Sequence, residues 1–278
     1  MSLISSLDSG ISALDSFNQG LQVIGNNIAN INTTAFKASN ASFADSLSDT
    51  LQAASPGSDA AAMQIGTGVQ MAGINTDFAQ GSLVQTGVVT NLAVSGNGYF
   101  VVQNPSTSAA YATRDGTFSF DSSGNLINAQ SYKVLDGTGA VISISNCVNP
   151  AGTAMTSANT SSVTIGTDGT VTAYDSSGTA YTGQKVGLLT VTNQSKLMNQ
   201  GNNLYNFAAT GATLAANLGT ANTGSLGSIQ SGQIEQSNVD LTTQFGNMIT
   251  AQRSFEAASR VVTVSDSILN TIVNLKNQ

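Results

Sequence analysis

The chain of 278 residues has no histidine, no tryptophan and one cysteine, and only 8% of its residues are charged. An ordinary globular domain has about 25% charged residues. The absence of histidine excludes Ser-His-Asp and Cys-His nucleophile systems and removes the commonest metal ligand. A single cysteine excludes an internal disulfide, a cysteine zinc site and a CxxC redox pair. We therefore expect a protein that is not an enzyme, with no catalytic residues, cofactor or metal.

Basic residues and long apolar runs are also scarce. Lysine and arginine number 8 against 15 acidic residues, which gives a net charge of −7 and no electrostatic footprint for nucleic acid. Since no apolar run reaches about 18 residues, we expect no membrane-spanning helix. The first residues lack the basic segment that opens a secretory signal, so cleavage of a signal peptide is not expected.

Near the N-terminus, apolar residues recur with a seven-residue period. A second set lies three or four residues away, with Gly10 as its one gap, so the two sets form a stripe typical of helices that pair lengthwise. The period predicts a helix over residues 3–31. The packing positions of this helix are Leu7, Leu14, Phe17, Leu21, Ile24, Ile28 and Ile31.

The C-terminal segment has the same character and predicts a helix over about residues 240–275. Ser237 or Asn238 is the expected N-cap, because both residue types accept hydrogen bonds from free backbone N–H groups. The packing positions here are Leu241, Met248, Phe255, Val262, Leu269 and Ile272.

Neither helix can bury its own stripe. Each stripe could pack on a globular core, or the two could pair with each other and with copies from other subunits. We favour the second interpretation, because the seven-residue repeat is sustained and the stripes occupy the two ends of the chain.

The middle of the chain is predicted to be β. Short apolar or alternating runs are separated by dipeptides such as Asn97-Gly98 and Asp168-Gly169, which favour tight hairpin turns. We interpret the Asp residues of these turns as turn-forming rather than catalytic. The expected fold class is α+β, with a discontinuous, coiled-coil-like helical domain from both termini and a mainly antiparallel β domain. The expected segments are an N-terminal helical part (1–37), a connector (38–68), the β domain (69–200), an extended connector (201–236) and a C-terminal helical part (237–278).

Several motifs together resemble the bacterial flagellar axial proteins, the group of rod and hook subunits. The sequence IGNNIAN at residues 24–30 and NTTAFK at residues 32–37 open the resemblance, and YATRDGTF at residues 111–118 and SNVDL at residues 237–241 continue it. The positions that match the family motifs are Asn26, Asn27, Asn30, Phe36, Lys37, Asn238, Asp240, Gln252 and Arg253. The family usually has glycine where Ala35 stands. If that glycine takes a positive φ, Ala35 is strained or its turn differs.

The resemblance implies a structural subunit that stacks with its own copies into a helical tube, with the two terminal helices lining the channel and the β region outside. Its implied partners are itself, the adjacent rod, hook–filament junction and hook cap proteins, and the flagellar type III export apparatus. It implies a place in the flagellum, outside the cell for a hook and across the periplasm in the basal body for a rod.

Two members of the family fit the chain. Its length resembles the distal rod subunit, whereas residues 43–45, 65–80 and 268–275 look more like the hook. We expect the hook, a joint that passes motor torque to the filament, with a distal or proximal rod subunit as the alternative. A secreted β-rich adhesive or binding protein is the remote alternative.

Overall fold

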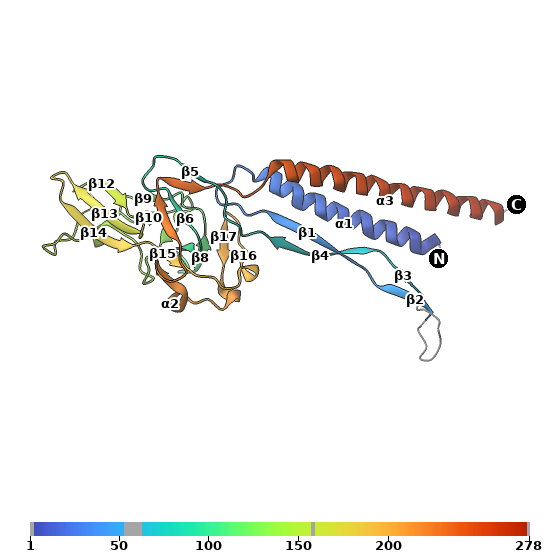
Figure 1. Ribbon diagram of the computed structural model, residues 1–278, viewed down its shortest axis with the longest axis horizontal. Helices are drawn as coiled ribbons and strands as arrows, with labels where there is room; N and C mark the ends of the chain where they lie inside the picture. Colours follow the sequence, from blue (N-terminus) through green and yellow to red (C-terminus); the bar gives the residue numbers. More distant parts are fainter. Residues whose placement is uncertain (1–2, 53–62, 157–158, 277–278) are drawn as a thin grey trace. The chain divides into compact units, whose positions relative to one another are not determined.

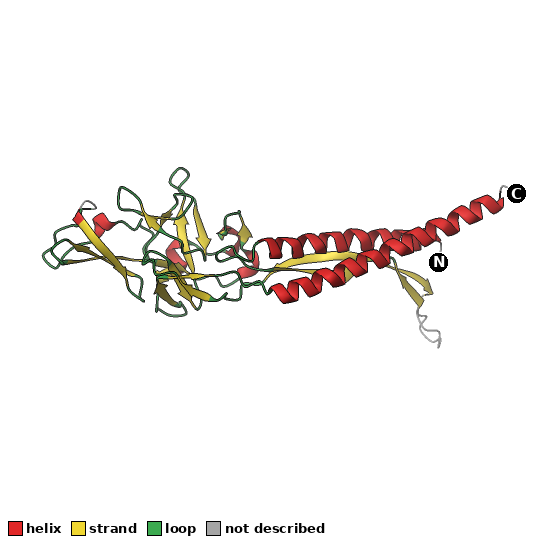
Figure 2. Ribbon diagram, turned by 90° about the horizontal axis from the view of Figure 1, so that it is seen from above, coloured by secondary structure: helices red, strands yellow, loops and turns green. Residues whose placement is uncertain are grey.

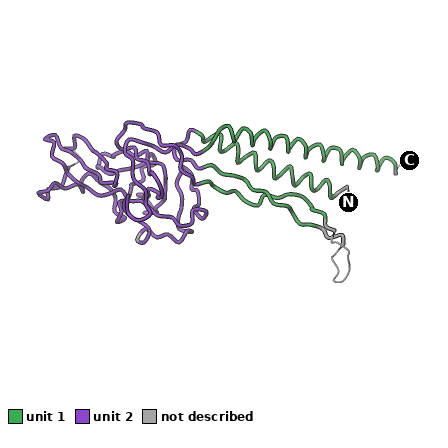
Figure 3. Tube along the Cα trace, viewed as in Figure 1, with its two compact units in different colours: residues 1–31, 38–77, 239–278 green, residues 32–37, 78–238 purple. Residues whose placement is uncertain are grey.

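The computed structural model describes residues 3–52, 63–156 and 159–276. The chain forms two compact units (Figure 3). Unit 1 comprises Met1–Ile31, Ala38–Asp77 and Val239–Gln278, and unit 2 comprises Asn32–Lys37 and Phe78–Asn238. Long helices from both ends of the chain and antiparallel pairing of the described strands confirm the α+β fold class. In the described part of the chain, no helix combines the length and apolar character needed to cross a bilayer.

Unit 1 contains the two long helices, α1 (Leu3–Ala29) and α3 (Leu241–Lys276), which lie side by side (Figures 1 and 2). They run antiparallel, since Ser6 near the start of α1 lies 3.5 Å, hydroxyl to hydroxyl, from Ser265 in the later part of α3. A Cβ at Gly10 would lie only 2.8 Å from Cγ2 of Val262. The gap in the apolar stripe is therefore a place where the second helix packs closely against α1.

Two hairpin ladders complete unit 1. Strand β1 (Ser39–Asp45) pairs with β4 (Val69–Thr76), and β2 (Ser48–Gln52) pairs with β3 (Met63–Gly66), both antiparallel. Serines of α1 hold the start of β4 in place, because Ser16 Oγ donates to the Val69 carbonyl at 3.2 Å. The expected boundary at residue 69 differs from this arrangement. Residues 69–76 supply the hydrogen-bond partners of residues 39–45, so they belong to unit 1 rather than to the β domain.

Unit 2 is built around a nine-stranded sheet. At its centre, β7 (Tyr99–Gln103) pairs with β8 (Ala110–Thr113), β11 (Lys133–Val134) and β15 (Gly187–Leu189). Side chains alternate along β7, so Phe100 and Val102 enter one apolar cluster and Tyr99 and Val101 another. The remaining strands of this sheet are β9 (Ser119–Phe120), β10 (Leu126–Ile127), β16 (Met198–Asn199), β17 (Leu204–Asn206) and β18 (Leu218–Thr220).

Unit 2 also contains smaller sheets. A three-stranded sheet contains β12 (Thr160–Ile165), β13 (Thr170–Asp175) and β14 (Ala180–Lys185). Two-stranded ladders join β6 (Leu92–Ser95) to β19 (Ser228–Ser231) and β5 (Leu83–Gln85) to β20 (Gln233–Glu235). The described residues of unit 2 also include the short helix α2 (Leu214–Asn217) and the 3-10 turns Ile144–Asn146, Gln194–Lys196 and Ala208–Thr210.

Residues 201–236 do not form the extended connector that their Asn- and Gly-rich composition suggested. They contribute β17, β18, β19 and β20 to the sheets of unit 2, and Leu204, Tyr205 and Ile229 are buried. The few apolar residues of this stretch are thus its core contacts. The polar residues between them form turns, as at Asn202 and Asn203, which both adopt positive φ.

The Asp168-Gly169 turn forms as expected, whereas Gly116 and Gly137 of the other two Asp-Gly dipeptides do not take a positive φ. Asp168 accepts hydrogen bonds from the Thr170 N–H at 3.1 Å and the Thr170 hydroxyl at 2.7 Å, and Gly169 takes a φ of +81°. Cys147 is fully buried in the first apolar cluster, where a Cβ at Gly183 would collide with its sulfur. Burial raises the pKa of this thiol, which therefore acts as a small apolar side chain.

Candidate assembly surfaces and a buried ionic cluster

The packing positions of α1 are only partly covered within one chain. Helix α3 lies along one side of α1, and the β1–β4 hairpin along another. Each of these side chains keeps part of its surface in contact with solvent. The half-buried positions are Leu7, Leu14, Phe17, Leu21, Ile24, Ile28 and Ile31.

On α3 the seam with α1 is made of smaller side chains than the sequence indicated. Gln244, Ala258 and Ser265 are buried at intervals of seven or fourteen residues, whereas Met248, Val262 and Leu269 are half-buried. The other predicted positions, Leu241, Phe255 and Ile272, are exposed by 39%, 37% and 50%. Small residues let the helices approach, so the larger apolar side chains flank the seam and remain uncovered.

A second apolar surface, which the sequence reading did not single out beyond Ile272, lies along the later part of α3. Its members are spaced three or four residues apart, so they share one side of the helix. We call this surface the α3 stripe. It consists of Val261 (48% exposed), Val264 (56%), Ile268 (41%), Ile272 (50%) and Leu275 (67%). The signal in the sequence was a second set of apolar residues beside the seven-residue repeat.

A groove of about 290 Å³ opens between α1, β1 and α3, all within unit 1. The rings of Phe17 and Phe43 meet edge to face in its wall, with centroids 6.0 Å apart. Gly20 makes room for this contact, because a Cβ there would lie 3.0 Å from the Phe43 ring. The other lining residues are aliphatic or neutral and polar, so the groove carries no charged side chain. We call it the α1–α3 groove.

Three motif residues act within unit 1. The Asn27 side chain is 1% exposed and clamps the start of β1, because its amide donates to the Ser39 carbonyl at 2.7 Å and its oxygen accepts from the Ser39 N–H at 2.9 Å. The same amide donates to Gln244 Oε1 on α3 at 3.2 Å. Asn30 donates to the Asn26 side chain at 2.6 Å, one turn earlier. The motif thus ties the end of α1 to both of its neighbours.

Asp240 caps the start of α3, whereas Ser237 and Asn238 were the expected caps. Its carboxylate accepts from the Thr242 N–H at 3.1 Å and the Thr243 hydroxyl at 2.6 Å. These hydrogen bonds, that of Thr243 first, lower the pKa of Asp240. The expectation was wrong because the helix starts one residue after Asp240, while Asn238 donates its amide to the Ala79 carbonyl at 3.1 Å.

Gln252 and Arg253 are exposed on α3. Arg253 pairs with Glu256 at 3.0 Å, with side-chain exposures of 77% and 54%. Such an exposed pair contributes at most about 1 kcal/mol. These two motif residues do not face α1, and their surroundings within one chain do not explain them. Phe36 is half-buried in unit 2, where its carbonyl accepts from the Asn238 N–H.

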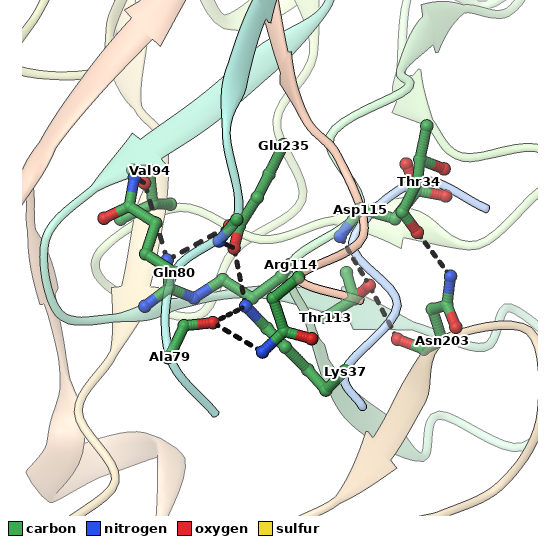
Figure 4. A network of polar contacts seen from close by, with 12 residues as sticks. Thr34, Lys37, Ala79, Gln80, Val94, Thr113, Arg114, Asp115, Asn203 and Glu235 are labelled. Atoms are coloured by element: carbon green, nitrogen blue, oxygen red, sulfur yellow. Dashed lines mark hydrogen bonds and ion pairs between the residues drawn. The ribbon is translucent and has the colours of Figure 1, made fainter. Parts of the chain in front are cut away.

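Lys37 is buried in unit 2, where it enters an ionic cluster with Glu235 and Arg114 (Figure 4). Lys37 Nζ lies 2.6 Å from Glu235 Oε1, and Arg114 Nη1 lies 3.3 Å from Glu235 Oε2. The side chains of Lys37, Arg114 and Glu235 are 1%, 5% and 0% exposed. Arg114 also donates to the Gly96 carbonyl at 2.8 Å and lies 5.0 Å from the centre of the Tyr99 ring.

Three distant parts of the sequence meet in this cluster. Lys37 ends the NTTAFK motif and Arg114 belongs to the YATRDGTF motif. Glu235 lies two residues before the start of the SNVDL segment. The sequence reading found Lys37 but missed Glu235, the residue that joins the other two. A carboxylate with no exposed surface has no path to a substrate. Each charge of the cluster depends on the others, because removal of one partner would leave an unpaired buried charge. Burial in the same region raises the pKa of Tyr205 to about 12.

Ala35 lies beside the cluster with a φ of +56° and no exposed surface. Its N–H donates to the Glu235 carbonyl at 2.8 Å. A side chain in the left-handed region costs about 1–2 kcal/mol relative to the right-handed one. The strain anticipated at this position is therefore present.

Comparisons with known protein families match three parts of the chain. The flagella basal body rod protein family covers residues 7–37, the D1 domain of the flagellar hook protein FlgE/F/G family covers residues 93–173, and the C-terminal region of the flagellar basal body rod FlgEFG family covers residues 230–275. The chain belongs to the family of flagellar rod and hook proteins.

Among individual relatives, the chain is 37% identical to the flagellar basal-body rod protein FlgG of Bacillus subtilis, over 99% of this chain and 100% of the relative. It is 33% identical to FlgG of Buchnera aphidicola subsp. Baizongia pistaciae, over 93% and 95% of the two chains. With the flagellar hook protein FlgE of Salmonella typhimurium it is 26% identical, and that alignment extends over 418 positions.

The protein is thus a structural subunit of the bacterial flagellum and not an enzyme, as the motifs indicated. The choice of the hook over the rod is less well supported. The FlgG relative aligns over 281 positions, close to the length of this chain, whereas the hook relative requires a much longer alignment.

Proposed function

We propose that this chain is a rod subunit of the flagellar basal body, of the distal rod type, which polymerises into the stiff tube that carries motor rotation outward. The observation that carries the proposal is the match to FlgG along the whole length of both chains, at higher identity than the match to the hook protein. The rod, our alternative on the sequence alone, replaces the hook as the main interpretation.

The surfaces of unit 1 supply the driving force in this proposal. Leucine, isoleucine, valine and phenylalanine side chains of α1 and α3 remain partly or largely exposed in the single chain. Burying such surface stabilises an assembly by about 25 cal/mol per Å² of apolar area. The helical segments would form the inner wall of the tube, and the β region, with its closed core, the outer part.

The proposed partners are copies of the same chain and the axial proteins above and below it in the flagellum. The subunit reaches them through the flagellar export apparatus. The packing and motif residues are proposed contacts of this polymer. Among the motif residues, Gln252 and Arg253 are the best candidates for contacts between subunits. Both are exposed on α3, and the ion pair of Arg253 lies on the surface.

Electron microscopy of basal bodies from cells that lack the gene tests the proposal. A rod subunit predicts basal bodies with a shortened rod and no hook, and restored rods when the full chain is supplied again. Complete rods that lack only the hook would overturn the proposal in favour of a hook subunit. Intact flagella would overturn both.

A further inference from the structure

The α1–α3 groove, lined by apolar and neutral polar side chains, and the aliphatic α3 stripe are two uncharged surfaces at different places on unit 1. We propose that the α3 stripe of one copy seats in the α1–α3 groove of the next copy. This inference rests on the proposed polymerisation and names the surfaces that make one of its contacts. The apolar side chains that line the groove are those of Phe17, Val23, Ile24, Ala41, Phe43 and Ala251.

The shape of the two surfaces favours a helix as the occupant. The stripe residues lie three or four positions apart on α3, which is the spacing that a helix presents when it lies in a groove. The groove measures about 290 Å³, just below the roughly 300–1,000 Å³ typical of small-molecule pockets. It therefore suits a few aliphatic side chains from a helix laid along it better than an enclosed ligand.

Charge narrows the choice of occupant. The groove lining contains no charged side chain, and the five stripe residues are all aliphatic. A charged peptide or a nucleic acid would lose its hydration in this groove without gaining a partner for its charge. A neutral aliphatic helix face carries no charge whose hydration would be lost, and α3 presents such a face in every copy.

The lengths of the helices show that the last residues of the stripe are not covered by α1. Helix α3 has 36 residues and α1 has 27. Since the helices are antiparallel and Ser6 lies beside Ser265, the first residue of α1, Leu3, lies near the level of Ile268 on α3. The last turns of α3, with Ile272 and Leu275 exposed by 50% and 67%, thus extend past α1.

The contact can repeat from copy to copy. Each copy carries one groove and one stripe, and a contact between two different surfaces need not close on a pair. Thr250 in the groove and Ile268 in the stripe lie about 27 Å apart along α3, at ~1.5 Å per residue. A disulfide requires Cα atoms within roughly 7 Å, so cysteines at these positions can join only different copies.

Cysteine cross-linking in intact basal bodies tests the proposal. In a motile Cys147→Ala background, cells produce two single-cysteine forms together, Thr250→Cys and Ile268→Cys, and purified basal bodies are oxidised and run on a non-reducing gel. We expect a dimer in which mass spectrometry finds residue 250 linked to residue 268. The matched control replaces Ile268→Cys with Thr263→Cys, an exposed position on a different side of α3, and should give no such dimer.

A form that carries both Thr250→Cys and Ile268→Cys distinguishes an open contact from a closed pair. An open contact gives a ladder of trimers and longer products, whereas products that stop at the dimer would overturn the proposal. Val264→Cys provides a second stripe probe if Ile268→Cys does not assemble.

Normal basal bodies with no 250–268 link, or a link only to another axial protein, would also overturn the proposal. In those cases the polymerisation function stands, because the protein is still present in the rod. That function fails independently if the gene-deletion strain keeps a complete rod.

Discussion

Unit 1 and unit 2 differ in how far they bury their large apolar side chains. The largest fully buried apolar side chains of the described residues, such as Tyr99, Phe100 and Leu188, belong to unit 2. Most of the large exposed apolar side chains, such as Ile249, Val264 and Leu275, belong to unit 1. Unit 2 thus closes its core within one chain, whereas unit 1 leaves apolar surface that only other molecules can cover.

The two units also differ in their polar contacts, which include buried ion pairs in unit 2 and neutral hydrogen bonds in unit 1. Unit 2 buries the Lys37–Glu235–Arg114 cluster, in which each charge depends on the others. Unit 1 holds its helices and hairpins with neutral groups, as in the bonds of Asn27 and Ser16. Buried ion pairs fix one arrangement, because breaking them leaves an unpaired buried charge. Unit 2 therefore closes its core within one chain, and under the proposed function the contacts of unit 1 are completed by assembly.

The largest effect is expected from a substitution that removes part of the exposed apolar surface of unit 1. Phe255→Asp places a charge on a half-open apolar position of α3, so we expect loss of incorporation into the flagellum and loss of swimming. Unit 2 should keep its fold, since Phe255 belongs to unit 1. Thr263→Asp is the matched control on the exposed polar side of the same helix. Swimming assays and basal-body composition measure the effect, and normal swimming of Phe255→Asp would contradict it.

Glu235→Gln tests whether unit 2 depends on its buried charges. The amide leaves Lys37 and Arg114 buried without their carboxylate, and breaking a buried pair in this way destabilises a protein by about 3–5 kcal/mol. Denaturant unfolding followed by tyrosine fluorescence reports on this unit, because Tyr99 and Tyr205 lie in its core. Asp168→Asn removes the 2.7 Å pair with Lys185, whose side chains are 43% and 45% exposed, and should change stability by less than about 1 kcal/mol. Equal losses in the two variants would contradict the expected role of the cluster.

Gly10→Ala and Gly25→Ala form a matched pair within α1. A Cβ at position 10 lies 2.8 Å from Val262, so this substitution should destabilise the helix pair by roughly 1–3 kcal/mol. A Cβ at position 25 meets no atom within 4 Å, so the gain in helix propensity should stabilise unit 1 by about 0.5–1 kcal/mol. Thermal unfolding followed by far-UV circular dichroism measures both changes. Destabilisation by both variants would show that the helices are not held at the distance described.

Ala35→Gly should stabilise unit 2 by about 1 kcal/mol, because glycine adopts the +56° φ of this position without strain. The lost methyl group reduces the gain, since Ala35 is fully buried. The same tyrosine-monitored unfolding measures the change, with Ala112→Gly, at a buried alanine of unit 2 that has no positive φ, as the comparison. A loss of stability in Ala35→Gly would mean that methyl packing outweighs the backbone strain.

The smallest effect concerns the start of α3. The pKa of Asp240 is lowered in the folded chain, so its capping contribution is complete above the ordinary Asp pKa and is lost as the pH falls through the lower folded value. Helicity measured by far-UV circular dichroism should therefore fall slightly more between about pH 5 and pH 2 in the native chain than in Asp240→Asn, which caps without titrating. Identical curves would contradict a capping role.

Some of the fold follows from local patterns. The seven-residue apolar period placed the helices to within about two residues of α1 and α3, and the Asp-Gly dipeptides located turns such as that at Gly169. The extent of unit 1 did not follow, because the partner of β1 lies some thirty residues further along, in a segment that reads equally well as the first strand of a β domain. The N-cap was misplaced because Ser237, Asn238 and Asp240 all suit a cap, and only the start of the helix selects among them.

The sequence by itself determined the two terminal helices, the turn at Asp168-Gly169, the family, and the exclusion of histidine chemistry and of an internal disulfide, since these depend on composition and on spacing along a few turns. Only the tertiary structure decided which sides of α1 and α3 meet, which apolar residues stay uncovered, and that Lys37, Arg114 and Glu235 share one buried cluster. The physical reason is that a repeat fixes a side of a helix but not its neighbour. Burial and ion pairing arise between residues far apart in the chain, and they exist only once the chain has closed on itself.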